Sequence, residues 1–149
     1  MRLKGEPMPP TRVAGLRATD ELCRDCQACA LGCSLYHDGE CNLHLARLAV
    51  TKDQARYEFA ITICRHCEHP DCLEACPTGA ISLDDRGVAI LNDAECNRCG
   101  ACAAACPYEA ISYNEARDRY LKCDLCAGRG VGPLCVELCP VGALTLEVG

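Results

Sequence analysis

Cysteine dominates the chemistry available to this chain of 149 residues, which contains 17 cysteines. Sixteen of them fall into four motifs of four residues each. The motifs are Cys23-x2-Cys26-x2-Cys29-x3-Cys33, Cys64-x2-Cys67-x4-Cys72-x3-Cys76-Pro77, Cys96-x2-Cys99-x2-Cys102-x3-Cys106-Pro107 and Cys123-x2-Cys126-x8-Cys135-x3-Cys139-Pro140. Thiolates at such spacings are ligands of iron–sulfur clusters, and four motifs suit four [4Fe–4S] clusters. The sequence therefore predicts one-electron redox chemistry.

The fourth cysteine of each motif is expected to serve a different cluster from the first three. Where two clusters lie side by side in one small protein, this residue ligates the neighbouring cluster. The second and third motifs then form the sets Cys64, Cys67, Cys72 with Cys106, and Cys96, Cys99, Cys102 with Cys76. By exclusion, the first and fourth motifs form Cys23, Cys26, Cys29 with Cys139, and Cys123, Cys126, Cys135 with Cys33. Each predicted set is named below by its first cysteine.

Zinc and disulfides are the alternative uses of so many cysteines. Zinc ribbons use pairs of Cys-x2-Cys, which would leave the third cysteine of the dense runs and the Cys-Pro pairs unexplained. A disulfide scaffold would suit a short secreted protein, but the cysteine count is odd and residues 1–22 contain no apolar secretion signal. We therefore expect a reduced, cytoplasmic setting, unless a partner with an export signal carries the chain across a membrane.

The charge and the apolar pattern restrict the partners. The 15 basic and 21 acidic residues give a formal net charge of −6, which disfavours nucleic acid. No run of 18 apolar residues is present, so no membrane span is expected. No substrate pocket, general base or flavin site is visible, so we expect a non-catalytic chain rather than an enzyme.

An internal repeat predicts the fold. Cys76-Pro-Thr-Gly-Ala-Ile81 recurs at 106–111 and 139–144, each time before residues of strand type. We expect strands at 81–83, 88–91, 111–113, 120–121 and 144–148, a strand that enters Cys64, and short helices such as 100–106. This is an α+β fold of two nested bacterial-ferredoxin-like modules, each binding two clusters. The inner module is 64–111, the outer module is 20–63 plus 112–149, and 1–19 form an irregular arm.

Two segments resemble a known family. CRHCEHPDCLEACPTGAI (64–81) and KCDLCAGRGVGPLCVELCPVGAL (122–144) are similar to the four-cluster electron-transfer subunits of the dimethyl sulfoxide reductase type. The segment 33–48 resembles a subgroup that serves tungsten aldehyde oxidoreductases and carbon monoxide dehydrogenases, through His37, Gly39, Asn42 and Arg47. Ser34, where the family has proline, and Cys41 depart from the pattern.

The resemblance implies a larger catalytic partner subunit with a tungsten or molybdenum pterin, and the subgroup favours an aldehyde oxidoreductase. A flavin- or nicotinamide-dependent subunit and end-to-end self-association are further candidates. The alternatives are a freely diffusing polyferredoxin, a module that clusters only stabilise, or a subunit of a carbon monoxide dehydrogenase, hydrogenase or aromatic acyl-CoA reductase.

Four features outside the ligand sets also have expected roles. Cys41 is expected to be a small buried apolar residue, and His37 a local hydrogen-bonding residue. His66 is expected to lie in a solvated or hydrogen-bonded loop, with pH-dependent tuning of a cluster as the alternative. Gly128 to Gly132 form a plain loop rather than a phosphate site, because no strand and helix flank them.

Overall fold

The chain consists of short helices and four separate pairs of antiparallel strands. The computed structural model describes residues 13–148, and the side chains of residues 15–147. No sheet within this range exceeds two strands. Such pairs are marginal alone and need other elements to cover them.

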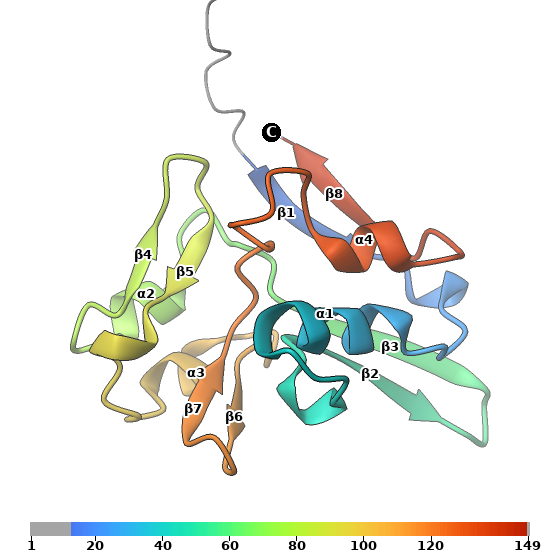
Figure 1. The fold of residues 1–149 in the computed structure, drawn as a ribbon, viewed down its shortest axis with the longest axis horizontal. Coiled ribbons are helices and arrows are strands. Elements are labelled where there is room, and N and C mark those ends of the chain that lie inside the picture. The colour runs from blue at the N-terminus through green and yellow to red at the C-terminus, as the bar shows by residue number, and fades with distance from the viewer. Residues whose placement is uncertain (1–12, 149) are drawn as a thin grey trace, which may run out of the picture.

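One half of the fold joins the two ends of the described chain. Strand β1 (Val13–Ala18) pairs with β8 (Leu144–Val148), and helix α1 (Ala28–Asp38) packs against α4 (Leu134–Leu138). The hairpin of β2 (Leu48–Asp53) and β3 (Glu58–Ile63) lies beside α1 (Figure 1).

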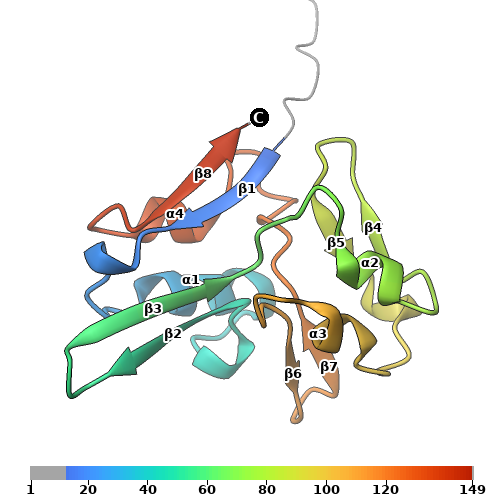
Figure 2. The same cartoon turned by 180° about the vertical axis from the view of Figure 1, so that it is seen from behind.

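The central part of the sequence forms the other half. Its elements are α2 (Asp71–Ala75), β4 (Ile81–Leu83), β5 (Ala89–Leu91), α3 (Ala101–Ala105), β6 (Ser112–Asn114) and β7 (Arg119–Leu121). Helix α2 packs against α3, and the strands pair as β4 with β5 and β6 with β7. Both views place α2, β4 and β5 away from α4, β1 and β8 (Figures 1 and 2). Short 3₁₀ turns at Asp20–Leu22, Leu43–Leu45 and Asp93–Glu95 complete the elements.

The start of the chain differs from the expectation. Residues 13–18 were expected to lie in the irregular arm 1–19, but they form strand β1; the rest of that arm, 1–12, lies outside the described residues. The partner strand β8 is at the other end of the sequence, so no local pattern could indicate the pairing. The strands after the cysteine motifs lie within one residue of their expected positions.

Helix α1 is longer than the helices at the other three fourth cysteines. Those helices end at the cysteine that precedes proline, because proline cannot continue a helix. After Cys33 stands Ser34, and α1 continues to Asp38 before Gly39 ends it at φ 74°. The Ser34 hydroxyl is fully buried, donates to the carbonyl of Leu31 and accepts from the N–H of Asn42. The missing proline thus lets α1 hold the following loop.

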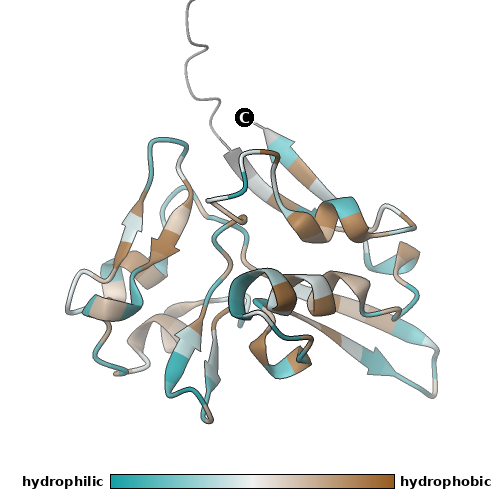
Figure 3. Cartoon of the chain, in the orientation of Figure 1, coloured by the Kyte–Doolittle hydropathy of each residue, from teal (hydrophilic) through white to brown (hydrophobic). Residues whose placement is uncertain are grey.

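The apolar interior has two parts, and cysteine is prominent in both. The larger core gathers Leu16, Leu48, Ile63 and Leu144 around several cysteines, and the smaller one packs Ile81, Ala89 and Ile111 around Cys102. Figure 3 shows hydrophobic residues along α1 and α4 and hydrophilic residues at the turn between β2 and β3. Among the described residues, no helix has the length and apolar character to cross a membrane.

Candidate functional site

The four thiols of the predicted Cys64 set line one small cavity. Cys64 follows β3, Cys67 and Cys72 flank the start of α2, and Cys106 comes from the end of α3. The charges of Cys64 and Cys106 each add to the burial that raises the pKa of Cys67. The third motif therefore brings its last cysteine to the first three of the second motif.

The predicted Cys23 set lines a second cavity. Cys23, Cys26 and Cys29 lie in and after the loop before α1, and Cys139 ends α4. Burial, with smaller contributions from neighbouring cysteines that include Cys139, raises the pKa of Cys29 to about 11. The packing of α1 against α4 brings the two ends of the sequence together here.

The other two sets are indicated by the electrostatics of single members. Burial raises the pKa of Cys102, and the charges of Cys96 and Cys76 raise it further. Burial raises the pKa of Cys135 to about 12, with contributions from Cys33, Cys126 and Cys29. These neighbours come from the motifs that the sequence predicts to exchange a ligand.

Backbone N–H groups donate to the sulfurs in a repeated way. His66, Arg98 and Leu125 stand two residues after Cys64, Cys96 and Cys123, and each donates its N–H to that cysteine at 3.4–3.5 Å. All three have positive φ, as does Asp25 two residues after Cys23. The left-handed conformation turns the loop inward, and N–H···S bonds of this kind are a main determinant of cluster potential.

The segment after the fourth cysteine supplies further donors. Ala110 donates its N–H to Cys106 at 3.5 Å, and Ala143 donates to Cys139 at 3.2 Å. A hydrogen bond from the Thr78 side chain, with backbone N–H groups, lowers the pKa of Cys76 to about 7. The Cys-Pro repeat thus places N–H groups around the fourth thiolate.

The donor sets fit [4Fe–4S] clusters. Groups of four thiols share apolar surroundings that raise the pKa of several members, so a bound cation is what would favour their thiolate forms. Four sulfur ligands from sequential and exchanged cysteines are the usual shell of a cubane. The N–H donors aimed at the same sulfurs match the anionic character of that shell.

A charged network holds the loop after α1. Asp38 forms ion pairs with Arg47 and Arg119, and its carboxylate is 4% exposed. His37 bonds the carbonyl of Cys33 and, at 2.9 Å, the carboxylate of Asp124. Hydrogen bonds to Asp124 and Cys33 outweigh burial and raise the pKa of His37 to about 10. The prediction that His37 bonds locally is therefore confirmed, and its partners brace the Cys33 and Cys126 region.

Two residues differ from their expected environment. Cys41 is exposed rather than buried, because it follows the end of α1 at Gly39 and no element covers it. His66 is 3% exposed, and burial together with the charge of Lys122 lowers its pKa to about 3. The imidazole is therefore neutral over the physiological range, which removes pH-dependent tuning there.

Lys122 was not identified from the sequence. Its side chain is 6% exposed, and its ammonium group lies 3.3 Å from the sulfur of Cys64. The only signal was its position directly before Cys123, and nothing local indicates contact with a residue 58 positions away.

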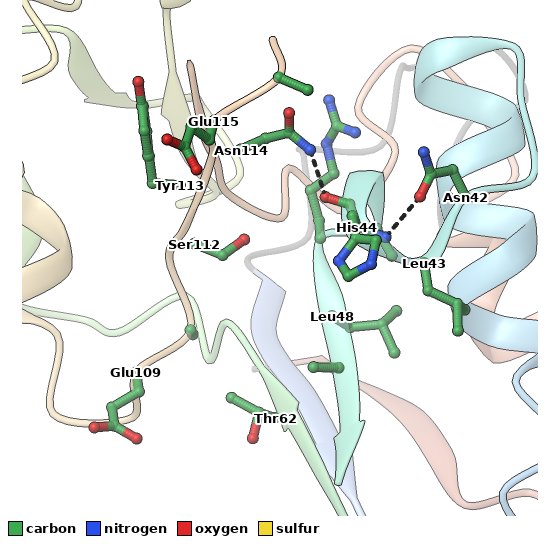
Figure 4. A pocket seen from close by; sticks show the side chains of 15 residues that line it. Asn42, Leu43, His44, Leu48, Thr62, Glu109, Ser112, Tyr113, Asn114 and Glu115 are labelled. Carbon is green, nitrogen blue, oxygen red and sulfur yellow. Dashed lines mark hydrogen bonds between the residues drawn. The ribbon is translucent and has the colours of Figure 1, made fainter. Parts of the chain in front are cut away.

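A surface hollow lies away from the cysteines. The turn Leu43–Leu45, β2 and β6 line it, and no described cysteine does so (Figure 4). Asn114 donates to the carbonyl of His44, and Asn42 accepts from the His44 N–H. These polar groups serve the backbone of the turn rather than forming a reactive constellation.

Comparison with known proteins identifies the family. The family described as 4Fe-4S dicluster domain matches residues 55–148. The putative oxidoreductase AegA of Escherichia coli (strain K12) is 36% identical over 143 residues, which are 88% of this chain but 21% of AegA. The B subunit of the anaerobic dimethyl sulfoxide reductase of Haemophilus influenzae is 33% identical over 147 residues, 87% of this chain and 71% of that protein.

A solved structure is also similar. It is the active site complex BamBC of benzoyl coenzyme A reductase with benzoyl-CoA, with a TM-score of 0.56 and 26% identity over 93% of this chain and 82% of the matching subunit. The resemblance to the dimethyl sulfoxide reductase type is thereby confirmed, and the chain belongs to the 4Fe-4S dicluster domain family.

Proposed function

We propose that this chain is an electron-transfer subunit that holds four [4Fe–4S] clusters and relays single electrons between a catalytic oxidoreductase subunit and another redox carrier. The Cys23, Cys64, Cys96 and Cys123 sets are the proposed ligands. The clusters would supply reversible one-electron reduction. The chain itself would bind them, set their spacing and exclude water.

The succession of the ligand sets is the observation that carries this proposal. Cys76 lies near Cys102, which connects the Cys96 set to the second motif. Cys64 lies near Cys123, and Cys29 near Cys135, close enough for each charge to raise its neighbour's pKa. The sets therefore follow one another as Cys96, Cys64, Cys123 and Cys23. A continuous series of redox sites suits electron relay.

Exposure along this series supports a path with two ends. Cys99 in the Cys96 set and Cys26 in the Cys23 set are exposed, whereas all four members of the Cys123 set are buried. Electrons could then enter and leave at the two end sets without contact between solvent and the buried one. Two nested modules, 20–63 plus 112–149 and 64–111, are proposed from the helix pairs α1 with α4 and α2 with α3.

A larger catalytic subunit with a tungsten or molybdenum pterin is the proposed partner, with aldehyde oxidoreductase as its narrower form. Relatives named as a dimethyl sulfoxide reductase component and a formate dehydrogenase iron-sulfur subunit support a subunit role. The His37 to Arg47 segment does not identify the substrate, because His37, Gly39, Asn42 and Arg47 all have local roles.

An aromatic acyl-CoA reductase is the second candidate. The solved complex named above contains benzoyl-CoA, and its similar subunit aligns with 93% of this chain. That observation concerns the partner only, and the electron-relay role is the same in both cases.

Purification from native extract under anaerobic conditions tests the proposal. A subunit should elute with a larger chain, whose metal and pterin content separate the two candidates. The clusters in that complex should be reduced by its substrate. Elution of the chain alone with redox-active clusters would favour a diffusing polyferredoxin, and clusters that no accessible potential reduces would contradict electron transfer.

A further inference from the structure

Lys122 has a buried ammonium group with three acceptors. Its Nζ donates to the sulfur of Cys64 at 3.3 Å, the carbonyl of Ala89 at 2.5 Å and the carbonyl of Cys123 at 3.1 Å. An ammonium group has three N–H donors, so these contacts use all of them. The position of the charge is therefore fixed between β5 and the two cysteines.

Charge balance directs this ammonium toward the ligand set. A buried charge is costly unless a group of opposite charge lies beside it. Of the three acceptors, only the Cys64 sulfur can become anionic. The lysine lines the cavity of the Cys64 set, where its charge also opposes the burial that raises the pKa of Cys72.

His66 offers a second donor in the same cavity. Its Nδ1 accepts the N–H of Ala89 at 3.2 Å, so in the neutral ring the proton is on Nε2. Among the described residues, no group bonds this buried Nε2, although the ring lines the cavity. A buried N–H without a partner is rare in proteins, and an anionic group in the cavity would satisfy it.

We propose that Lys122 is a positioning residue that raises the reduction potential of the iron–sulfur group held by the Cys64 set, with His66 as a weaker second donor. This inference rests on the proposed electron-transfer function. A positive charge and N–H donors stabilise the reduced, more negative state, which raises the potential.

The location of Lys122 gives this effect a role. Its contacts join Cys64 of the second motif to Cys123 of the fourth, where the Cys64 and Cys123 sets meet. The same ammonium therefore holds two successive sets together and biases the electron toward one of them.

Redox titration of the anaerobically prepared full-length chain, followed by electron paramagnetic resonance, tests the inference. The signal of the Cys64 set is identified by its loss in Cys72→Ala. In Lys122→Met that signal should require a lower potential. At the wild-type midpoint, its ratio of reduced to oxidised form should fall about tenfold, or ~59 mV for one electron.

Matched variants separate charge from structure. Lys122→Arg keeps the charge and should shift the signal much less than Lys122→Met. Lys52→Met removes an exposed lysine that pairs with Asp25, and should leave the Cys64-set signal unchanged. His66→Phe removes the neutral donor and should give a smaller downward shift.

The outcomes distinguish this inference from the proposed function. Unchanged midpoints in Lys122→Met with full iron content, or equal shifts in the Met and Arg variants, would overturn it. If Lys122→Met loses iron, Lys122→Gln and His66→Phe decide, and the inference fails unless both lower the midpoint. A wild-type chain that binds no redox-active iron would instead refute the proposed function.

Discussion

The sulfur atoms of this chain lie among backbone N–H groups as well as among one another. Three of the four cysteine loops share the donor two residues after the first cysteine, with φ between 46° and 62°. The residues at these positions are a histidine, an arginine and a leucine, so the conformation does not depend on side-chain type. Cysteine spacing alone identifies the loop, which is why the ligand sets could be predicted from the sequence.

Ligand exchange gives a prediction for a single residue. Cys106→Ala should damage the group held by Cys64, Cys67 and Cys72, because Cys106 lines their cavity. Iron content and the signals of single clusters, measured beside Cys102→Ala, would report it. Loss confined to the cluster of Cys96, Cys99 and Cys102 in the Cys106 variant would be incompatible with exchange.

The buried carboxylate of Asp38 gives a second prediction. It pairs with Arg47 and Arg119, and removing one partner of a buried ion pair typically costs about 3–5 kcal/mol. Asp38→Asn should lower the apparent Tm of the cluster-loaded chain clearly. Glu147→Gln breaks an exposed pair with Arg17 and should cost less than about 1 kcal/mol. Equal effects of the two variants would show that the Asp38 network does not stabilise the fold.

Residues that act across the fold were the ones that the sequence could not reveal. Lys122 and Arg119 contact positions 58 and 81 residues away, and no local pattern distinguishes them from surface residues. Cys41 was misjudged for a related reason. An apolar residue is buried only where another element covers it, and none does so after Gly39.

At the scale of elements, strand β1 is tied to the Cys64 loop at one glycine. Gly15 has φ +117°, and a Cβ there would lie 2.2 Å from the carbonyl oxygen of Arg65. The strand can approach the ligand loop only because this residue has no side chain. The pairing of β1 with β8 thus covers the loop that begins the second motif.

Gly15→Ala should therefore destabilise the chain. The backbone clash adds to the strain of positive φ, which alone costs about 1–3 kcal/mol. Gly39 provides the matched control, because its φ is +74° but nothing lies within 4 Å of its Cβ position. Apparent Tm values should fall further for Gly15→Ala than for Gly39→Ala. The reverse order would mean that β1 does not press against the Arg65 carbonyl.

Element prediction succeeded where repeat and turn signals were local. The hairpin of β4 and β5, helix α3 and strand β8 all follow from the Cys-Pro repeat and the residues after it. Strand β1 could not be predicted, because its partner is distant in sequence. The length of α1 follows from Ser34, a departure whose structural consequence became evident only with the helix.

At the scale of the whole molecule, cysteines occupy much of the interior. Five cysteines belong to the larger core, beside few large apolar side chains. Metal binding should then contribute to folding, as it does in small metal domains. Removal of iron by oxidation in the presence of a chelator should abolish most of the secondary structure, measured by far-ultraviolet circular dichroism. A chain that keeps its spectrum and melting transition without iron would contradict this.

The number of irons per chain tests the account most directly. Four cubanes require about sixteen irons, with an equal number of inorganic sulfides. Quantification of iron, sulfide and zinc in anaerobically prepared full-length protein should give those values with no stoichiometric zinc. A limit near eight irons after full reconstitution would mean that two of the four ligand sets do not bind clusters, and zinc in place of iron would contradict electron transfer altogether.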